Sequence, residues 1–107
     1  MVPAPQFMKD YVISYFILNQ KQWKLVYWDD KSLLFLKDLP KFRNVISLYE
    51  YNYINPYNFV FNKNLIEMGV KDNNKTVYRE LLRKKEEEPN GYFINYMLKY
   101  YGNRVHP

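Results

Sequence analysis

The fold is decided by the fifteen residues from Trp23 to Lys37, which read WKLVYW, DDKS and LLFLK in turn. The first and last of these segments are short apolar runs with the aromatic and β-branched residues that strands favour. The Asp-Asp-Lys-Ser segment between them is rich in residues that favour turns. The stretch therefore predicts a β-hairpin over about 23–37. Strand alternation would put Trp23, Leu25 and Tyr27 on one of its faces.

Two short segments precede the hairpin. Residues 1–5 contain two prolines and predict a flexible lead-in. Over residues 6–20, apolar side chains recur at helical spacing, which predicts an N-terminal helix. The β-branched Val12, Ile13 and Ile17 favour a strand in the same segment, so both interpretations stay open.

After the hairpin, the spacing of the apolar and aromatic residues along the sequence changes twice. Leu39-Pro40 can start a helix that runs to Tyr49, because proline is tolerated in the first helical turn. Residues 49–54 alternate tyrosine with other residues and predict extended chain that ends at Pro56. The polar segment 62–74 predicts turns with one short helix around 65–68.

The last third of the chain is more regular. Thr76 can cap a helix, Pro89-Asn90-Gly91 can break it, and a second helix can end at Gly102. This pattern predicts an antiparallel helix pair over 76–101. Together, the sequence predicts a single α+β domain over 1–107, with an N-terminal helix, a β-hairpin and a mainly helical C-terminal part. Its expected core includes Trp23, Leu25, Tyr27, Phe35, Leu81 and Tyr96.

The composition excludes several classes of enzyme. The 107 residues include no cysteine, one histidine (His106) and three glycines. Disulfides, cysteine nucleophiles, histidine acid–base sites and glycine-rich phosphate loops are therefore excluded. The adjacent Asp29 and Asp30 should point apart on a tight turn, and Glu86-Glu87-Glu88 should form a solvated face. We expect no catalytic residue, no metal and no cofactor in the isolated chain.

Charge and hydropathy give further expectations. The net charge is +5, yet no block of five like charges occurs, so the chain has no basic arm of the nucleic-acid type. The longest mostly apolar run covers residues 11–18, whereas a bilayer span needs about 20 residues. Lys9 and Asp10 fall where a signal peptide would be apolar. We expect a soluble chain without a membrane span of its own.

Tyrosines are concentrated between residues 49 and 61. A tyrosine offers apolar area with a polar tip, which suits sugar stacking, base stacking or a protein interface. Tyr51, Tyr53 and Tyr57 are therefore the candidate interaction surface. Because 20% of the chain is aromatic, packing in the core is the alternative for the same residues.

Several of these motifs resemble the soluble tail of one family of membrane proteins. The tail has a tryptophan, a strand, an aspartate-containing turn and a second strand, then Tyr-x-Tyr with a following proline, and a helix boundary of tetratricopeptide type. The matching parts here are residues 23–37, Tyr51-Asn-Tyr53 with Pro56, Arg79-Glu80-Leu81-Leu82, Pro89-Asn90 and residues 98–101. The family comprises bacterial and archaeal multi-spanning, glycosyltransferase-like proteins that use lipid-phosphate sugars.

The resemblance implies a non-catalytic accessory domain on the extracytoplasmic side of a membrane. Its partner would be the rest of its own membrane polypeptide or a glycan. In that family the catalytic aspartates lie in the membrane part, so none is carried over to this chain. Two alternatives remain, a small basic nucleic-acid-binding protein and a free-standing protein-interaction adaptor; without the resemblance, the expected location is cytoplasmic.

Overall fold

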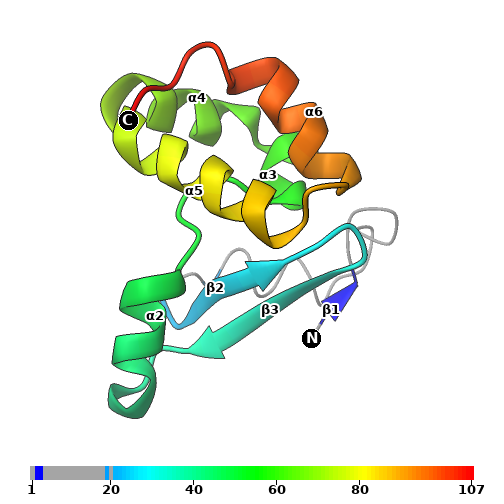
Figure 1. Ribbon diagram of the computed structural model, residues 1–107. Coiled ribbons are helices and arrows are strands. Elements are labelled where there is room, and N and C mark those ends of the chain that lie inside the picture. Colours follow the sequence, from blue (N-terminus) through cyan, green and yellow to red (C-terminus); the bar gives the residue numbers. More distant parts are fainter. Residues whose placement is uncertain (1, 4–18, 20) are drawn as a thin grey trace. The chain divides into compact units, whose positions relative to one another are not determined.

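The computed structural model describes residues 2, 3, 19 and 21–107 (Figure 1). The helix predicted over 6–20 lies outside the described residues, apart from Asn19. The chain divides into two compact units, Met1–Asn52 and Tyr53–Pro107, where its length had predicted a single domain. The fold is α+β, as predicted, with the sheet in the first unit and a group of helices in the second.

The predicted hairpin is confirmed. Strand β2 (Trp23–Trp28) pairs antiparallel with β3 (Ser32–Lys37), and Trp23 lies opposite Lys37. The short strand β1 (Val2–Pro3) adds to the other edge of β3, which gives the order β1-β3-β2. Within the predicted lead-in 1–5, Val2 and Pro3 are extended chain that pairs at a sheet edge, a position that tolerates proline.

A bulge in β2 changes the predicted face of the hairpin. The register shifts between Leu25 and Tyr27, so Val26 is the extra residue on its strand. A bulge breaks the strict alternation of side chains. Leu25, Val26 and Trp28 are accordingly buried, whereas Tyr27 is only half-buried.

The first unit ends with a short helical segment, as the sequence predicts. A 3-10 turn, η2 (Pro40–Phe42), leads into helix α2 (Arg43–Tyr49), which buries Ile46. The chain then returns to the sheet in extended form, where the backbone N–H of Tyr51 donates to the carbonyl of Leu25 at 2.8 Å. The Tyr51 ring packs edge-on against Trp28, with 5.9 Å between ring centroids.

The second unit contains four helices along its described residues (Figure 1). They are α3 (Pro56–Phe61), α4 (Lys63–Asp72), α5 (Asn74–Glu87) and α6 (Tyr92–Tyr101). Helices α5 and α6 are the predicted antiparallel pair, and α6 ends at Gly102 as expected. Helix α5 begins two residues before Thr76, with Asn73 rather than Thr76 as its N-cap.

Helix α3 is absent from the sequence prediction, which took Pro56 as a stop. Pro56 instead occupies the first helical turn, and the side chain of Asn55 caps the helix by accepting from the Asn58 backbone N–H at 2.8 Å. Helix α4 is also longer than the predicted segment 65–68. The few polar residues that follow α3 are too weak a signal to predict where α4 begins.

The core of the second unit is tightly packed and mostly apolar, although Asn55, Asn58, Glu80 and Lys84 are also buried in this unit. At Gly69, an added Cβ would lie 2.6 Å from Cδ1 of Tyr53 and 2.8 Å from Cγ2 of Val77, so only glycine fits between these side chains. The fully or almost fully buried apolar residues are Ile54, Ile66, Val77, Leu81, Ile94, Met97 and Tyr101.

Candidate functional site

The predicted interaction surface is not a single patch. Tyr51 is only 4% exposed, because its backbone pairs with β2 and its ring packs on Trp28. For Tyr51, the structure therefore shows the alternative, packing in the core. Tyr53 and Tyr57 are half-buried; the Tyr53 hydroxyl accepts a hydrogen bond from Asn73, and the Tyr57 ring contacts Phe61.

The predicted core residues differ in how far the structure buries them. Leu25 and Leu81 are buried, while Trp23, Tyr27 and Phe35 are half-buried. Tyr96 is 43% exposed, so the core prediction is wrong there. Helix α6 is apolar on almost every side, and it turns Ile94, Met97 and Tyr101 inward instead.

The Asp29–Asp30 pair forms a turn. Asp29 Oδ1 accepts hydrogen bonds from the backbone N–H groups of Lys31 and Ser32, at 2.8 and 2.9 Å, and from the Ser32 hydroxyl at 3.0 Å. Partial burial alone would raise the pKa of Asp29, but these bonds and one from Tyr27 outweigh it and hold the pKa below its usual value. The carboxylate of Asp29 therefore stabilises the hairpin turn.

The most distinctive concave surface of the second unit lies between α3, the start of α4, and α6. This aromatic groove encloses about 340 Å³. Its lining residues are Phe59, Val60, Lys63, Tyr92, Phe93, Tyr96 and Tyr100. Sequence reasoning missed all of them except Tyr96, which it placed in the core.

The rings of the groove are in mutual contact. Phe59 packs edge-on against Tyr100 at 5.6 Å between centroids, and Tyr92 contacts Tyr96 at 4.9 Å. The ammonium of Lys63 lies 5.1 Å from the Phe59 ring centroid and 5.0 Å from that of Tyr100. A cation over two ring faces is held by their quadrupoles, so the charge of Lys63 sits within the groove.

The tyrosines of the groove are open to solvent. Tyr92, Tyr96 and Tyr100 are 59%, 43% and 53% exposed, although Phe59 beneath them is buried. They recur every four residues along α6 and thus lie on one side of the helix. This spacing is the one signal in the sequence that could have revealed the groove.

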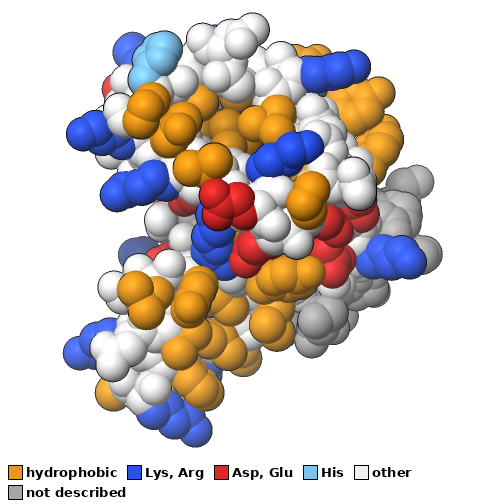
Figure 2. Space-filling model, viewed as in Figure 1, with side chains coloured by type: hydrophobic (Ala, Val, Ile, Leu, Met, Phe, Trp, Pro, Cys, Tyr) orange, Lys and Arg blue, Asp and Glu red, His pale blue; other side chains and the backbone are white. Residues whose placement is uncertain are grey.

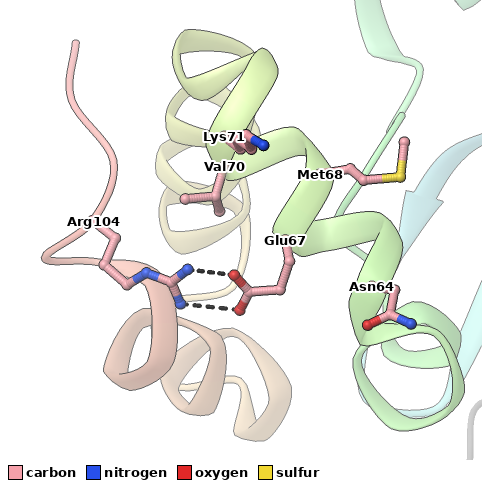
Figure 3. Close-up of a pocket in the computed structure, with 6 residues that line it drawn as sticks. All are labelled: Asn64, Glu67, Met68, Val70, Lys71 and Arg104. Atoms are coloured by element: carbon pink, nitrogen blue, oxygen red, sulfur yellow. Dashed lines mark hydrogen bonds and ion pairs between the residues drawn. The ribbon is translucent and has the colours of Figure 1, made fainter.

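A second hollow, of about 540 Å³, lies beside α4 (Figure 3). Figure 3 shows Glu67 and Arg104 pointing toward each other across it, joined by two hydrogen bonds between the guanidinium and the carboxylate. These bonds hold the pKa of Glu67 below its usual value. The bonded pair of Glu67 and Arg104 joins the C-terminal tail to α4.

The side chain of Asn74 fastens the same tail. Its amide donates to the carbonyl of Arg104 at 2.8 Å, and its oxygen accepts from the backbone N–H of His106 at 2.7 Å. The tail is therefore tied at two places.

The described part of the chain has neither a metal-binding cluster nor a membrane-spanning helix. No group of three or more histidine, aspartate and glutamate side chains there could hold a metal ion. No helix among the same residues has the length and hydropathy needed to cross a bilayer. The chain matches no protein-family model, no curated protein and no solved structure.

Proposed function

We propose that this chain is a non-catalytic interaction module, which binds an extended acidic segment of a protein partner in the aromatic groove. The observation that carries the proposal is the exposure of three tyrosines of α6 over the buried ring of Phe59. Tyrosine and phenylalanine are enriched at protein interfaces, because they bury a large area and tyrosine keeps a polar tip.

The spacing of the tyrosines suits an extended chain. Residues four apart on a helix are separated by a rise of about 6 Å. An extended polypeptide repeats the side chains of one face about every 6.6 Å. A bound strand can therefore place alternate side chains against successive tyrosine rings.

The charge of the groove favours a carboxylate. Lys63 is the one charged residue among the lining residues, and the ammonium of Lys99 lies 5.8 Å from the Tyr96 ring centroid. An acidic side chain of the partner can pair with either lysine. A single-stranded nucleic acid is the second candidate, since its bases could stack on the same rings, but its backbone needs a row of cations.

The family resemblance suggests which protein the bound segment belongs to. On that hypothesis, the native chain is the extracytoplasmic tail of a membrane glycosyltransferase-like protein, and the groove binds one of its own loops or, alternatively, a glycan. The native reading frame tests this part of the proposal. Membrane-spanning segments encoded upstream of Met1 would support it, whereas a stop codon directly upstream would contradict it.

Fluorescence anisotropy tests the groove itself. The probes are three labelled decapeptides with alternating leucine and a variable residue, which is glutamate, glutamine or lysine, together with a labelled ten-nucleotide thymidine strand. We expect the glutamate peptide to bind most tightly at 0.15 M salt. Binding of the thymidine strand alone would contradict the proposal and favour the nucleic-acid alternative.

Two variants locate the binding site. Tyr96→Ala and Lys63→Gln should each weaken binding of the glutamate peptide by about tenfold, the loss typical of interface hot spots. Tyr49→Ala is the matched control, because Tyr49 is a similarly exposed tyrosine of the other unit. An equal loss in the control would show that the peptide does not bind in the groove.

A further inference from the structure

Helix α2 of the first unit leaves three of its four apolar side chains exposed. Ile46 is buried, but Val45, Leu48 and Tyr49 are 41%, 73% and 47% exposed. These three residues are spaced by three and four positions, so they form one ridge along the helix. We call Val45, Leu48 and Tyr49 the α2 ridge.

Exposed cations lie close in the chain to the α2 ridge. Lys37, Lys41 and Arg43 are exposed at the end of β3, in η2 and at the start of α2. The carboxylate of Glu50 is partly neutralised by Lys24, whose Nζ lies 3.9 Å away, which leaves Asp38 as the exposed acid of this segment. Figure 2 shows orange apolar side chains next to blue lysine and arginine side chains over the part that Figure 1 labels α2.

We propose that the α2 ridge docks on an anionic lipid surface. A helix that presents an apolar stripe between basic residues lies in the membrane interface, with its apolar side chains among the acyl chains and its cations at the headgroups. Leucine and valine supply the apolar area, and tyrosine prefers the boundary between headgroup and acyl chain. The side chains of lysine and arginine are long enough to reach the headgroups from positions beside the ridge.

The charge around the α2 ridge favours a membrane over a second copy of the chain as its binding partner. Two copies that paired through this ridge would bring two sets of Lys37, Lys41 and Arg43 together, and like charges oppose such a contact. An anionic bilayer instead complements all three cations. The proposal does not depend on the aromatic groove, which belongs to the other unit.

Flotation with lipid vesicles tests the proposal on the full chain. We expect binding to vesicles of phosphatidylglycerol and phosphatidylcholine at 0.05 M salt, at least tenfold weaker binding to phosphatidylcholine alone, and a decrease as salt rises. Lys41→Gln should lower the partition coefficient by about fivefold, and Leu48→Ser should lower it by a similar factor. Both side chains are exposed, so the variants should keep the wild-type circular dichroism spectrum.

Matched controls come from the second unit. Met68→Ser removes an apolar side chain that is 58% exposed, and Lys75→Gln removes an exposed cation. Neither should change vesicle binding. No binding to the anionic vesicles, or equal losses in Met68→Ser and Leu48→Ser, would overturn the proposal.

Discussion

At the residue scale, Glu80 joins the start of the second unit to its longest helix. It is 6% exposed, and its Oε1 accepts hydrogen bonds from the backbone N–H groups of Tyr53 and Ile54 at 3.0 and 3.1 Å. A charged acceptor strengthens such bonds, and a buried N–H that loses its acceptor is costly. This carboxylate therefore helps to fix the position of the chain before α3, together with the amide of Asn58, which donates to the carbonyl of Tyr53.

We predict that Glu80→Ala lowers the free energy of unfolding by about 1.5–3 kcal/mol, since two backbone donors lose a charged acceptor. Urea denaturation followed by circular dichroism measures the change. Glu86→Ala is the control, because Glu86 is an exposed glutamate of the same helix, and it should change the free energy by less than about 0.5 kcal/mol. Equal effects in the two variants would show that the bonds to Tyr53 and Ile54 contribute nothing.

The tyrosines show where prediction from the sequence fails for single residues. Tyr51 was a candidate for the interaction surface, with packing in the core as the alternative, and it is buried, whereas Tyr96 was expected in the core and is exposed. Helical or strand spacing picks out a buried face only when the other face is polar. Along α6, aromatic residues occupy several faces, so only tertiary contacts decide which of them are buried. Around Tyr51 the tyrosines alternate with Glu50 and Asn52, and the contact with Trp28 is what buries Tyr51.

At the scale of elements, the hairpin and the helix pair were predictable because strong turn signals bound them. The segment from Asp29 to Lys31 separates β2 from β3, and Pro89 to Gly91 lies between α5 and α6. Helix α3 was missed because proline both ends extended runs and begins helices. The preceding Asn55 was the available cue, since asparagine is a favoured N-cap.

The bulge at Val26 had no comparable signal. It depends on how β2 pairs with β3, and a register shift of one residue exchanges the two faces of a strand. The aromatic groove was missed for a related reason. It needs α3 and α6 to lie side by side, and α3 was not predicted.

The C-terminal tail gives a prediction about pH. The hydrogen bonds from Arg104 lower the folded-state pKa of Glu67 below its ordinary value of 4.5, so folding is favoured while the carboxylate is charged. This stability is present above the ordinary value and is lost as the pH falls through the folded-state pKa. We expect Glu67→Gln to reduce the fall in thermal midpoint between pH 6 and pH 3, as measured by circular dichroism.

A second variant and a change of salt test the cause of this effect. Arg104→Gln should reduce the fall to the same extent, and the double variant should add nothing, because both changes break one pair. The effect should shrink in 1 M salt, since both side chains are 45% exposed. An unaltered pH dependence in Glu67→Gln would contradict the prediction.

At the scale of the whole molecule, the two units carry different candidate surfaces. The first carries the α2 ridge with its cations, and the second carries the aromatic groove with Lys63. The two proposals therefore predict opposite patterns of loss. Leu48→Ser should lower vesicle binding and spare peptide binding, whereas Tyr96→Ala should do the reverse.

The second unit also has a core of its own, from which we predict that residues 53–107 fold as a separate fragment. Val77 and Leu81 of α5 are buried together with Ile94, Met97 and Tyr101 of α6, and all five are at most 2% exposed. Domains of about 55 residues can bury enough apolar surface to fold alone. We expect a helical circular dichroism spectrum and a cooperative thermal transition. Leu81→Ala should abolish that transition, since such a cavity costs about 2–5 kcal/mol in a marginally stable fragment. A disordered spectrum for the unaltered fragment would contradict the prediction.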